Sequence, residues 1–241
     1  MDGSVREVRV PVRGLGSAVS ARVWSPADAS DDEPLPLLLA HDGPEYDERA
    51  DLTAYAAAMV AAGRLPRHRI ALLAPGDRNA WYSANTAYAA GLCLAVVPAL
   101  SAEFAVRGRP AGMGASLGAL AMLHAQRRYP GTFGGLFLQS GSYFVPVYDH
   151  MEAGFDRFGR IVRWVSATRR ATHAAETVPV VLTCGTFEEN LRNNRLMGRA
   201  LTRQRYPVRL VEAAGVHDWS SWRSCFDPYL TDLLAEAWRA A

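Results

Sequence analysis

Lysine is absent from this sequence of 241 residues, in which all 26 basic side chains are arginines. Chemistry that depends on a lysine amine is therefore excluded, including Schiff-base catalysis and a Walker-type phosphate site. Acidic side chains number 24, which leaves a formal net charge of only +2. Proteins that bind nucleic acid normally carry a clear basic excess, so we expect no nucleic-acid partner.

Cysteine is scarce, and Cys93, Cys184 and Cys225 lie far apart. An odd number without a CxxC pair predicts neither a disulfide framework nor a zinc site. We expect small buried thiols in a reducing compartment. The six histidines do not follow the HExxH spacing of a metal site, so the sequence predicts neither a bound metal nor a cofactor.

Long apolar runs are missing as well. No run approaches the roughly 18 residues that a membrane-spanning helix needs, and residues 1–7 lack the basic start and apolar stretch of a signal peptide. We therefore expect a cytoplasmic protein with no membrane partner. Hydrophobic residues nevertheless make up 49% of the chain, enough to build the core of one large domain over residues 1–241.

The pattern of apolar residues predicts strands that alternate with helices. An antiparallel hairpin is expected first, from residues 5–12 and 18–24 with Gly14 and Gly16 between them. Further strands are expected at residues 35–40, 69–74, 135–139, 178–183 and 208–212. Helices are expected at residues 51–62, 86–100, 117–128, 189–205 and 222–241. Pro98 is expected to break the second helix near its end. Such alternation is typical of an α/β fold with a mainly parallel sheet and helices on both faces.

One predicted helix is rich in arginine. Arg192, Arg195, Arg199 and Arg203 follow one another at steps of three, four and four residues, which places them on one face of the helix. Such a face is typical of a solvated helix surface, and an anion-binding surface is the alternative.

The pentapeptide 114–118 matches the GxSxG pattern of a nucleophile elbow, with Ser116 at its centre. Glycines on both sides of a serine relieve crowding where a strand turns sharply into a helix, and a predicted helix follows at once. The turn would expose the Ser116 hydroxyl and point the Leu117 amide at a developing oxyanion. The preceding residues 109–113 have poor strand propensity, although the pattern requires a strand there.

A serine hydroxyl needs a base that takes its proton and an acid that orients the base. In α/β-hydrolases the order along the chain is serine, acid, histidine, with the last two on loops after later strands. His217 lies on the loop after the last predicted strand and is the candidate base. The loop after the preceding strand offers Glu188 and Glu189 as the acid, and Asp218 beside the base is the weakest alternative.

These motifs resemble those of the esterase-D and enterochelin-esterase-like branch of the α/β-hydrolases, whose relatives include siderophore esterases, feruloyl esterases and mycolyltransferases. The resemblance covers nearly the whole chain from residue 37 onward and is carried by segments 39–43, 114–119, 137–142, 185–190 and 215–223. It implies an α/β-hydrolase fold with antiparallel N-terminal strands. It also implies Ser116 as nucleophile, His217 as base and, three residues after a loop glycine, Glu188 as the acid.

The resemblance further implies where the substrate and a second oxyanion donor lie. The family takes its second oxyanion amide from the loop after an Asp-Gly pair. Because Pro44 follows that pair here and has no N–H group, the Glu45 or Tyr46 amide is expected to supply the bond. An Arg-x-x-Glu segment often lies beside the active site in this family. Here Arg78 begins that segment, and Trp81 stands at the glutamate position.

Aromatic side chains near these motifs are candidates for an apolar or aryl-accepting pocket. They are Trp81, Tyr82 and Trp219, with Tyr143 and Phe144 as further candidates. The alternative for each is a place in the core, where large aromatic residues are more often found.

We therefore expect a serine esterase that cleaves a carboxylic ester through an acyl-enzyme on Ser116, without a cofactor. From the resemblance alone, its small-molecule substrate is expected to be an aryl ester or a siderophore-type lactone. Two alternatives use the same residues differently. One is an acyltransferase or ester-forming enzyme with the same triad, and the other is a hydrolase-fold protein that binds without catalysis.

Overall fold

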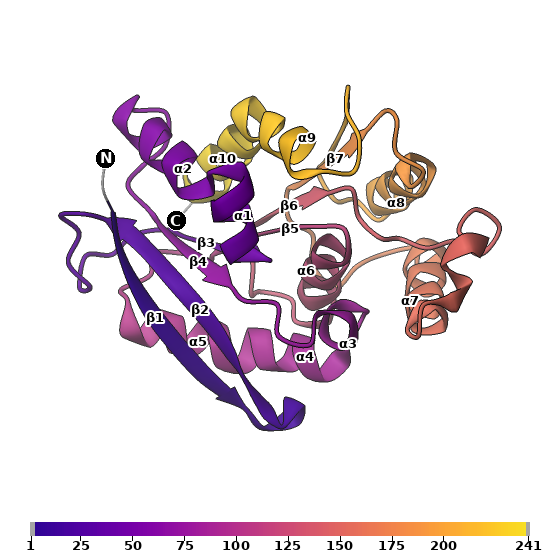
Figure 1. The fold of residues 1–241 in the computed structure, drawn as a ribbon, viewed down its shortest axis with the longest axis horizontal. Coiled ribbons are helices and arrows are strands. Elements are labelled where there is room, and N and C mark those ends of the chain that lie inside the picture. The colour runs from indigo at the N-terminus through magenta and orange to yellow at the C-terminus, as the bar shows by residue number, and fades with distance from the viewer. Residues whose placement is uncertain (1–2, 240–241) are drawn as a thin grey trace.

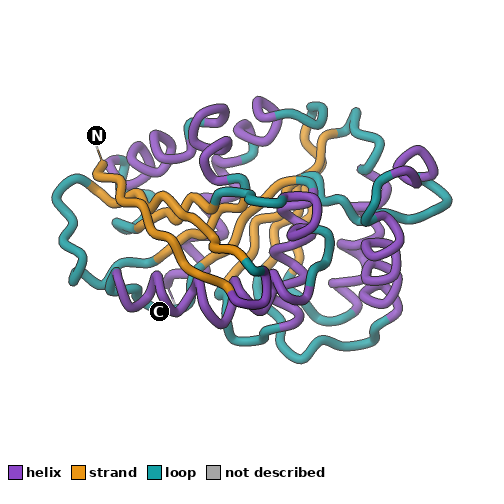
Figure 2. Tube along the Cα trace, turned by 60° about the horizontal axis from the view of Figure 1, so that its bottom comes forward, coloured by secondary structure: helices purple, strands orange, loops and turns teal. Residues whose placement is uncertain are grey.

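A mixed sheet of eight strands runs through the centre of the molecule (Figure 2). The computed structural model describes residues 3–239. The strands are β1 (Gly3–Val12), β2 (Ser17–Pro26), β3 (Leu37–His41), β4 (Arg69–Leu73), β5 (Ala111–Ala115), β6 (Gly135–Gln139), β7 (Val180–Gly185) and β8 (Val208–Ala213). They lie in the order β1-β2-β4-β3-β5-β6-β7-β8. β1 is antiparallel to β2 and β2 to β4, whereas the other neighbours are parallel.

The predicted N-terminal hairpin is confirmed. Val5 pairs with Trp24 in the antiparallel register, and the chain turns between the strands through the short helix η1 (Arg13–Leu15). Gly16 has a φ of 59° after this turn, a conformation that glycine adopts without strain. The hairpin extends diagonally past the parallel strands at the N-terminal edge of the sheet (Figure 1).

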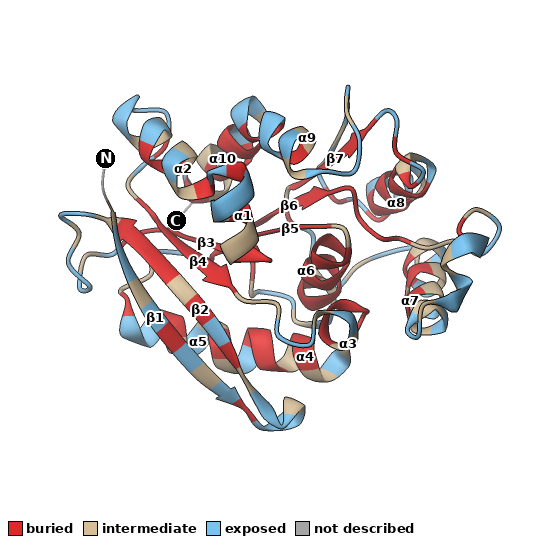
Figure 3. Ribbon diagram, in the orientation of Figure 1, coloured by how far each residue is buried: buried red, intermediate tan, exposed pale blue. Residues whose placement is uncertain are grey.

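Helices cover both faces of the sheet, as predicted (Figure 1). Leu37 and Leu39 of β3 belong to one apolar cluster and Leu38 and Ala40 to another, because alternate residues of a strand point to opposite faces. The first face is covered by α3 (Arg78–Tyr82), α4 (Thr86–Gly91), α5 (Val97–Glu103), α6 (Leu117–Arg128), α7 (Phe158–Arg170) and α8 (Leu191–Arg203). The opposite face is covered by α1 (Gly43–Ala50), α2 (Leu52–Ala61), α9 (Trp219–Ser224) and α10 (Thr231–Arg239). Strands β3 to β7 are buried along their whole length (Figure 3).

One apolar helical stretch is longer than predicted. α4, the π-helical turn η2 (Leu92–Val96) and α5 form one continuous helix of 18 residues. The predicted break at Pro98 is wrong, because η2 widens the helix just before it and the Val97 amide donates to the Leu92 carbonyl. With a mean hydropathy of 1.4, this helix is long and apolar enough to cross a membrane by composition, which corrects the expectation that no such stretch exists. In the structure it packs against the hairpin and α6, with 39% of its residues buried.

The C-terminal segment forms three helical pieces rather than the single predicted helix. α9 begins three residues earlier than predicted and is followed by the π-helical turn η4 (Phe226–Leu230) and α10. Asp227, the second residue of η4, interrupts the helical backbone, because its φ of −111° and ψ of 123° are not helical. The last two residues of the predicted helix, 240–241, lie outside the described residues.

β5 forms although its residues have poor strand propensity. It pairs in parallel with β3 on one side and β6 on the other. Its glycines are required by the helix that packs on it, since a Cβ atom on Gly112 would lie 2.5 Å from the Met122 sulfur of α6. Packing and strand pairing therefore outweigh local propensity here.

The arginine-rich helix α8 exposes Arg192, Arg195, Arg199 and Arg203, as predicted for a solvated face. Arg195 forms two hydrogen bonds of 2.6 Å with the Glu212 carboxylate. The buried state predicted for the three cysteine thiols is also confirmed.

Candidate active site

Ser116 lies at the sharp turn between β5 and α6. Its φ of 56° and ψ of −121° are strained for a residue that carries a side chain. The turn brings strand and helix so close that a Cβ atom on Gly114 would lie 2.6 Å from the carbonyl carbon of Gly118. The glycines of the pentapeptide are therefore required by packing, and the strand, turn and helix that a nucleophile elbow needs are all present.

A cleft of about 290 Å³ lies beside this turn, where segments that follow several parallel strands meet. This is the edge at which open α/β sheets bind ligands. The cleft is lined by Arg78, Ser116, Leu117, Ser142, Phe144, Asp149, Glu152, Phe155, Glu189, Asn190 and His217. Within residues 3–239, no group of three or more histidine, cysteine or acidic side chains is placed to hold a metal ion.

The structure brings His217 together with Glu188. Nδ1 of His217 lies 2.7 Å from Oε2 of Glu188, so Nε2 is the ring nitrogen available to exchange a proton. Of the other two candidate acids, Glu189 is exposed, and Asp218 caps α9 by accepting the Ser221 amide at 2.8 Å. Only Glu188 among the three acids contacts the histidine.

The Glu188 carboxylate is held by several donors and is almost completely buried, with its side chain 1% exposed. Oε1 accepts hydrogen bonds of 2.6 Å from the Ser140 hydroxyl and the Gly185 amide. Burial alone would raise the pKa of this carboxyl, but the hydrogen bonds from His217, Ser140 and Gly185 outweigh it and hold the pKa below its usual range. A carboxylate anion beside Nδ1 fixes the Nδ1–H tautomer and stabilises the protonated imidazole.

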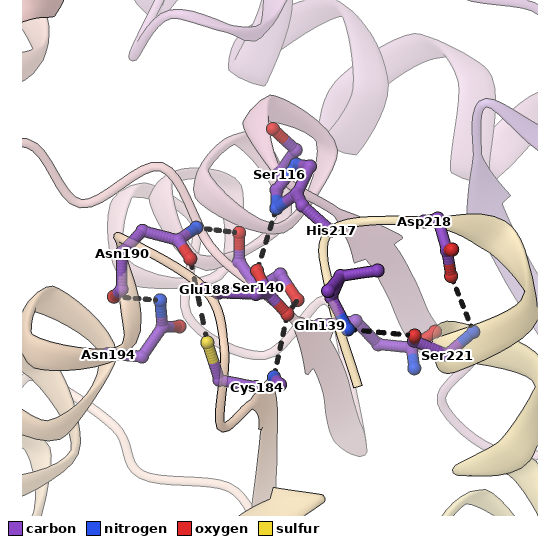
Figure 4. Close-up of polar contacts among 12 residues, drawn as sticks. Ser116, Gln139, Ser140, Cys184, Glu188, Asn190, Asn194, His217, Asp218 and Ser221 are labelled. Atoms are coloured by element: carbon purple, nitrogen blue, oxygen red, sulfur yellow. Dashed lines mark hydrogen bonds and ion pairs between the residues drawn. The ribbon is translucent and has the colours of Figure 1, made fainter. Parts of the chain in front are cut away.

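Further polar residues that the sequence analysis missed fix this pair in place (Figure 4). The Ser140 hydroxyl accepts a hydrogen bond from the Trp222 indole at 3.0 Å, and the Asn190 amide group donates to the Ser140 carbonyl at 2.8 Å. Asn194 of α8 exchanges two hydrogen bonds with the Gly141 backbone. Ser140 and Asn190 lie inside segments that carry the family resemblance, which is the signal that identifies them, whereas Asn194 lies outside those segments.

The hydroxyl of Ser116 lies 3.0 Å from that of Ser142. This is the hydrogen bond that the Ser116 side chain makes in the structure, while His217 lines the same cleft. Catalytic hydrogen bonds often tighten only when a substrate is bound. Ser142 is therefore the second hydroxyl that any assignment of the nucleophile has to consider.

The predicted oxyanion donors differ in their availability. The Leu117 amide is the first of α6 and has no hydrogen-bond partner within the described chain. Tyr46 is wrong as a donor, because its amide already donates to the Asp42 carbonyl at 2.9 Å as part of α1. The Glu45 amide lies in the first turn of that helix and has no such partner among residues 3–239, so it stays the candidate for the second donor.

Arg78 lines the cleft and is neutralised there by Asp42. The two side chains form a bidentate pair with both contacts at 2.8 Å. The Asp42 side chain is 6% exposed and packs against the first turn of α6, where a Cβ atom on Gly118 would lie 3.3 Å from it. Asp42 therefore holds Arg78 beside the elbow.

His41 supports the first turn of α6, next to Ser116. Burial lowers its pKa to about 4, so the ring is neutral at physiological pH and carries one N–H group. Its Nδ1–H donates to the Gly118 carbonyl at 2.9 Å, and Nε2 accepts from the Tyr88 hydroxyl at 2.9 Å. The ring fixes the start of α6 without taking part in the cleft.

Three aromatic residues predicted to bind substrate do not line the cleft. Trp81 is buried against Tyr88 with ring centroids 5.5 Å apart, and Tyr82 is completely buried. Trp219 packs edge-on against Tyr46. The predictions for Trp81 and Tyr82 are wrong, because α3 turns both side chains into the core. Trp219 is half-buried, and its role in binding substrate stays a prediction.

The segment after β6 supplies the apolar side of the cleft instead. Phe144 lines the cleft, whereas Tyr143 is completely buried in the core. Glu152 of the short helix η3 (His150–Gly154) and Phe155 line it as well. No motif marks these last two residues, and the sequence analysis missed them.

A family model described as "Putative esterase" matches residues 13–233. The chain belongs to this esterase family. Family membership confirms the predicted activity class, that of a carboxylic ester hydrolase. A search of the curated proteins found no match to the esterase.

Solved structures with the same fold include three ester hydrolases. A ferulic acid esterase matches with a TM-score of 0.79 and 18% identity over 98% of this chain and 99% of its own. Enterochelin esterase from Shigella flexneri matches with a TM-score of 0.78 and 20% identity over 98% of this chain and 58% of its own. An S-formylglutathione hydrolase from Staphylococcus aureus matches with a TM-score of 0.71 and 14% identity over 98% of this chain and 99% of its own. The likeness confirms the predicted α/β-hydrolase fold, and this chain spans little more than half of the enterochelin esterase.

Proposed function

We propose that the esterase hydrolyses carboxylic esters through an acyl-enzyme on Ser116, with His217 as general base and Glu188 as the acid that orients it. The observation that supports this best is the 2.7 Å contact of His217 with a buried, ionised Glu188, beside a cleft that Ser116 also lines. A strained serine, a histidine and a carboxylate in this chain order are the parts that acyl transfer needs.

In the first half of the proposed reaction, the Ser116 oxygen attacks the carbonyl carbon of the ester while its proton passes to Nε2 of His217. The carbonyl oxygen becomes an oxyanion, to which the Leu117 and Glu45 amides donate. Glu188 stabilises the imidazolium. The carbon–oxygen bond to the alcohol then breaks, and His217 returns the proton to the leaving oxygen.

In the second half, water takes the place of the alcohol. His217 accepts a proton from the water, whose oxygen bonds to the acyl carbon. The bond from that carbon to Ser116 then breaks, and the proton returns to the serine oxygen. The products are a carboxylic acid, an alcohol and the original enzyme, and the steps use the chain's own side chains.

The cleft favours an aryl or other apolar group on the ester. Phe144 and Phe155 line it, and Phe144 is supported from behind by Phe158 at a ring distance of 5.6 Å. Aromatic faces of this kind bind flat apolar groups. The structural neighbours include a ferulic acid esterase, whose name points to an ester of an aromatic acid.

The proposal is tested by labelling with a fluorophosphonate, read by intact mass, together with turnover of a short-chain aryl ester. Wild-type enzyme is expected to gain one adduct and to hydrolyse the ester, and Ser116→Ala is expected to do neither. Ser142→Ala is the matched control, because it removes the neighbouring hydroxyl and should still be labelled. The assignment of the nucleophile would be overturned if Ser116→Ala still formed an adduct. It would also be overturned if Ser142→Ala lost labelling while Ser116→Ala kept it.

Product analysis separates hydrolysis from acyl transfer. The ester is supplied with a competing alcohol, and the ratio of free acid to new ester is measured. Hydrolysis predicts free acid as the main product at every alcohol concentration below the molar range. Transfer of the acyl group to the alcohol at low concentration would favour the acyltransferase alternative.

A further inference from the structure

The two sides of the cleft differ in what they offer a substrate. Ser116 and His217 lie on the side proposed for the reaction, and the opposite side is formed by the segment between β6 and α7 together with the end of the loop before α8. That opposite side presents two aromatic rings and three carboxyl groups. They are Phe144, Phe155, Asp149, Glu152 and Glu189.

The one cationic side chain that lines the cleft within the described chain is already neutralised. Arg78 forms its bidentate pair with Asp42, whose side chain is 6% exposed. This pair occupies the Nε–Nη2 edge of the guanidinium, and the Asp42 carboxylate offsets its positive charge at contact distance. Arg78 therefore leaves little positive charge for a ligand.

The nearest arginine of α8 does not change this balance. Arg192 lies over the ring of Tyr148, with its guanidinium carbon 3.8 Å from the ring centroid. It does not line the cleft. Its guanidinium contacts the aromatic face of Tyr148, and among the described residues no ion pair joins it to the carboxyl groups of the cleft.

Two of the three acidic residues have unused hydrogen-bonding capacity. Asp149 is buried and occupied, because it accepts from the Val145 amide and from the Asn193 side chain. Its role is to brace the segment that carries Phe144 and Phe155. Glu152 is half-buried and Glu189 is exposed, and neither carboxylate has a hydrogen-bond or ion-pair partner among residues 3–239.

We propose that this side of the cleft selects esters that carry a positive charge, such as a quaternary ammonium group, near the ester bond. The inference rests on the proposed function of Ser116. Glu152 and Glu189 would attract the cation, and Phe144 and Phe155 would bind its alkyl surface through their ring faces. An anionic ester would be repelled by the same carboxylates.

The test compares esters of equal shape and different charge. Choline butyrate and 3,3-dimethylbutyl butyrate differ in one atom, a nitrogen cation against a neutral carbon, and 2-sulfoethyl butyrate supplies the anion. kcat/KM is measured by acid release for wild type and for the Glu152→Gln/Glu189→Gln double variant. Comparing the variant with the wild type cancels the intrinsic reactivity of each ester.

We expect the order choline ester, neutral ester, anionic ester in the wild type. In the double variant, the preference for the choline ester over its neutral counterpart should fall roughly tenfold, as expected for partly exposed charges acting with aromatic faces. The Glu7→Gln/Glu236→Gln double variant is the matched control, because it also removes two negative charges, from exposed positions on β1 and α10. It should keep the wild-type preference.

A preference that is equal in wild type and double variant would overturn the inference, as would a wild type that favours the neutral or the anionic ester. A second measurement covers esters that turn over too slowly. Two fluorophosphonates, one with a trimethylammonioethyl and one with a 3,3-dimethylbutyl group, are compared by their rates of labelling Ser116. If the ratio of the two labelling rates is the same in wild type and double variant, the proposed charge selection is wrong but the proposed function stands. If neither reagent labels Ser116, the proposed function is wrong.

Discussion

The two sides of the cleft are built in opposite ways. On the side of the proposed chemistry, Glu188 is buried and bonded by three donors, and Ser116 is fixed between a strand and a wholly buried first turn of helix. On the opposite side, Glu152 and Glu189 have no side-chain partners among the described residues. Ser116 is fixed by β5 and α6, whereas Phe144, Glu152 and Phe155 belong to the long connection between β6 and α7. Glu189 follows Glu188 on the loop after β7.

This difference separates what the fold demands from what a loop can vary. The position of Ser116 follows from the close approach of β5 and α6, which leaves no room for a Cβ atom at Gly114. The positions of Phe144 and Phe155 depend on a segment braced mainly by Asp149 and Asn193. Substitutions on the side of Ser116 should therefore lower kcat, whereas substitutions on the opposite side should change KM and the choice between esters.

The largest effect is expected from Glu188→Gln. The variant loses the negative charge that stabilises the His217 imidazolium and fixes its tautomer, so kcat should fall by roughly 10³-fold to 10⁴-fold for esters of every charge. The measurement is kcat and KM on neutral and cationic esters. Because the amide is the same size as the carboxyl group, thermal unfolding distinguishes this loss from misfolding.

The neighbouring variant Glu189→Gln sharpens the comparison. Its carboxylate lines the opposite side, so the change should act on KM and on the choice between charged and neutral esters. If Glu189→Gln lowered kcat as far as Glu188→Gln does, the division of the cleft into two functions would be wrong.

The sequence predicts the chemical side better than the recognition side, for a physical reason. Ser116, Glu188 and His217 are constrained by the turn geometry and by the order of the strands, and both constraints leave motifs in the chain. Glu152 and Phe155 are constrained only by their position over the cleft, which a sequence pattern does not encode.

The errors in the fold have a similar origin. The hairpin, α6 and β6 could be predicted because their apolar periodicity is local. The sequence does not predict β5 clearly, because glycine has a low strand propensity. The glycines make room for α6, and this is visible only in the folded structure. The sequence does not reveal whether residues beside Arg78 point to the cleft or to the core, and in the structure Trp81 stacks on Tyr88 of α4.

A smaller effect, on the free energy of unfolding, is expected when a glycine is replaced by alanine at the elbow or on α7. Gly114→Ala places a Cβ atom 2.6 Å from backbone atoms of Gly118 that cannot move away. The free energy of unfolding should fall by about 3 kcal/mol, with loss of labelling at Ser116. Gly159→Ala is the control on α7, where a Cβ atom meets nothing within 4 Å. It should raise the free energy of unfolding by about 0.5 kcal/mol, because alanine favours helix over glycine.

Urea unfolding of both glycine variants measures these changes. Equal stability of Gly114→Ala and wild type would mean that the elbow is looser than the structure shows. The claim that the chemical side is fixed by packing would then be lost.

The smallest effect is expected from Ser140→Ala, and it is seen best in how the free energy of unfolding depends on pH. The variant removes one of the hydrogen bonds that hold the pKa of Glu188 below its usual range, so this pKa should rise. It also leaves the Trp222 indole without its acceptor. Together these losses should lower the free energy of unfolding at pH 7 by about 2 kcal/mol, as measured by urea unfolding.

The pH dependence separates the two losses. A carboxyl whose pKa is depressed on folding stabilises the protein above its unfolded pKa of about 4.3, and this contribution disappears as the pH falls through the folded value. The contribution is smaller in Ser140→Ala, so the gap in stability between wild type and variant should be widest at neutral pH and should narrow below about pH 4. Trp222→Phe removes the indole donor to Ser140 and part of a packed ring but none of the donors to Glu188, so its gap should be less dependent on pH. A gap for Ser140→Ala that stays constant from pH 7 to pH 3 would mean that Ser140 serves the tryptophan alone, and that the network around Glu188 does not tune its charge.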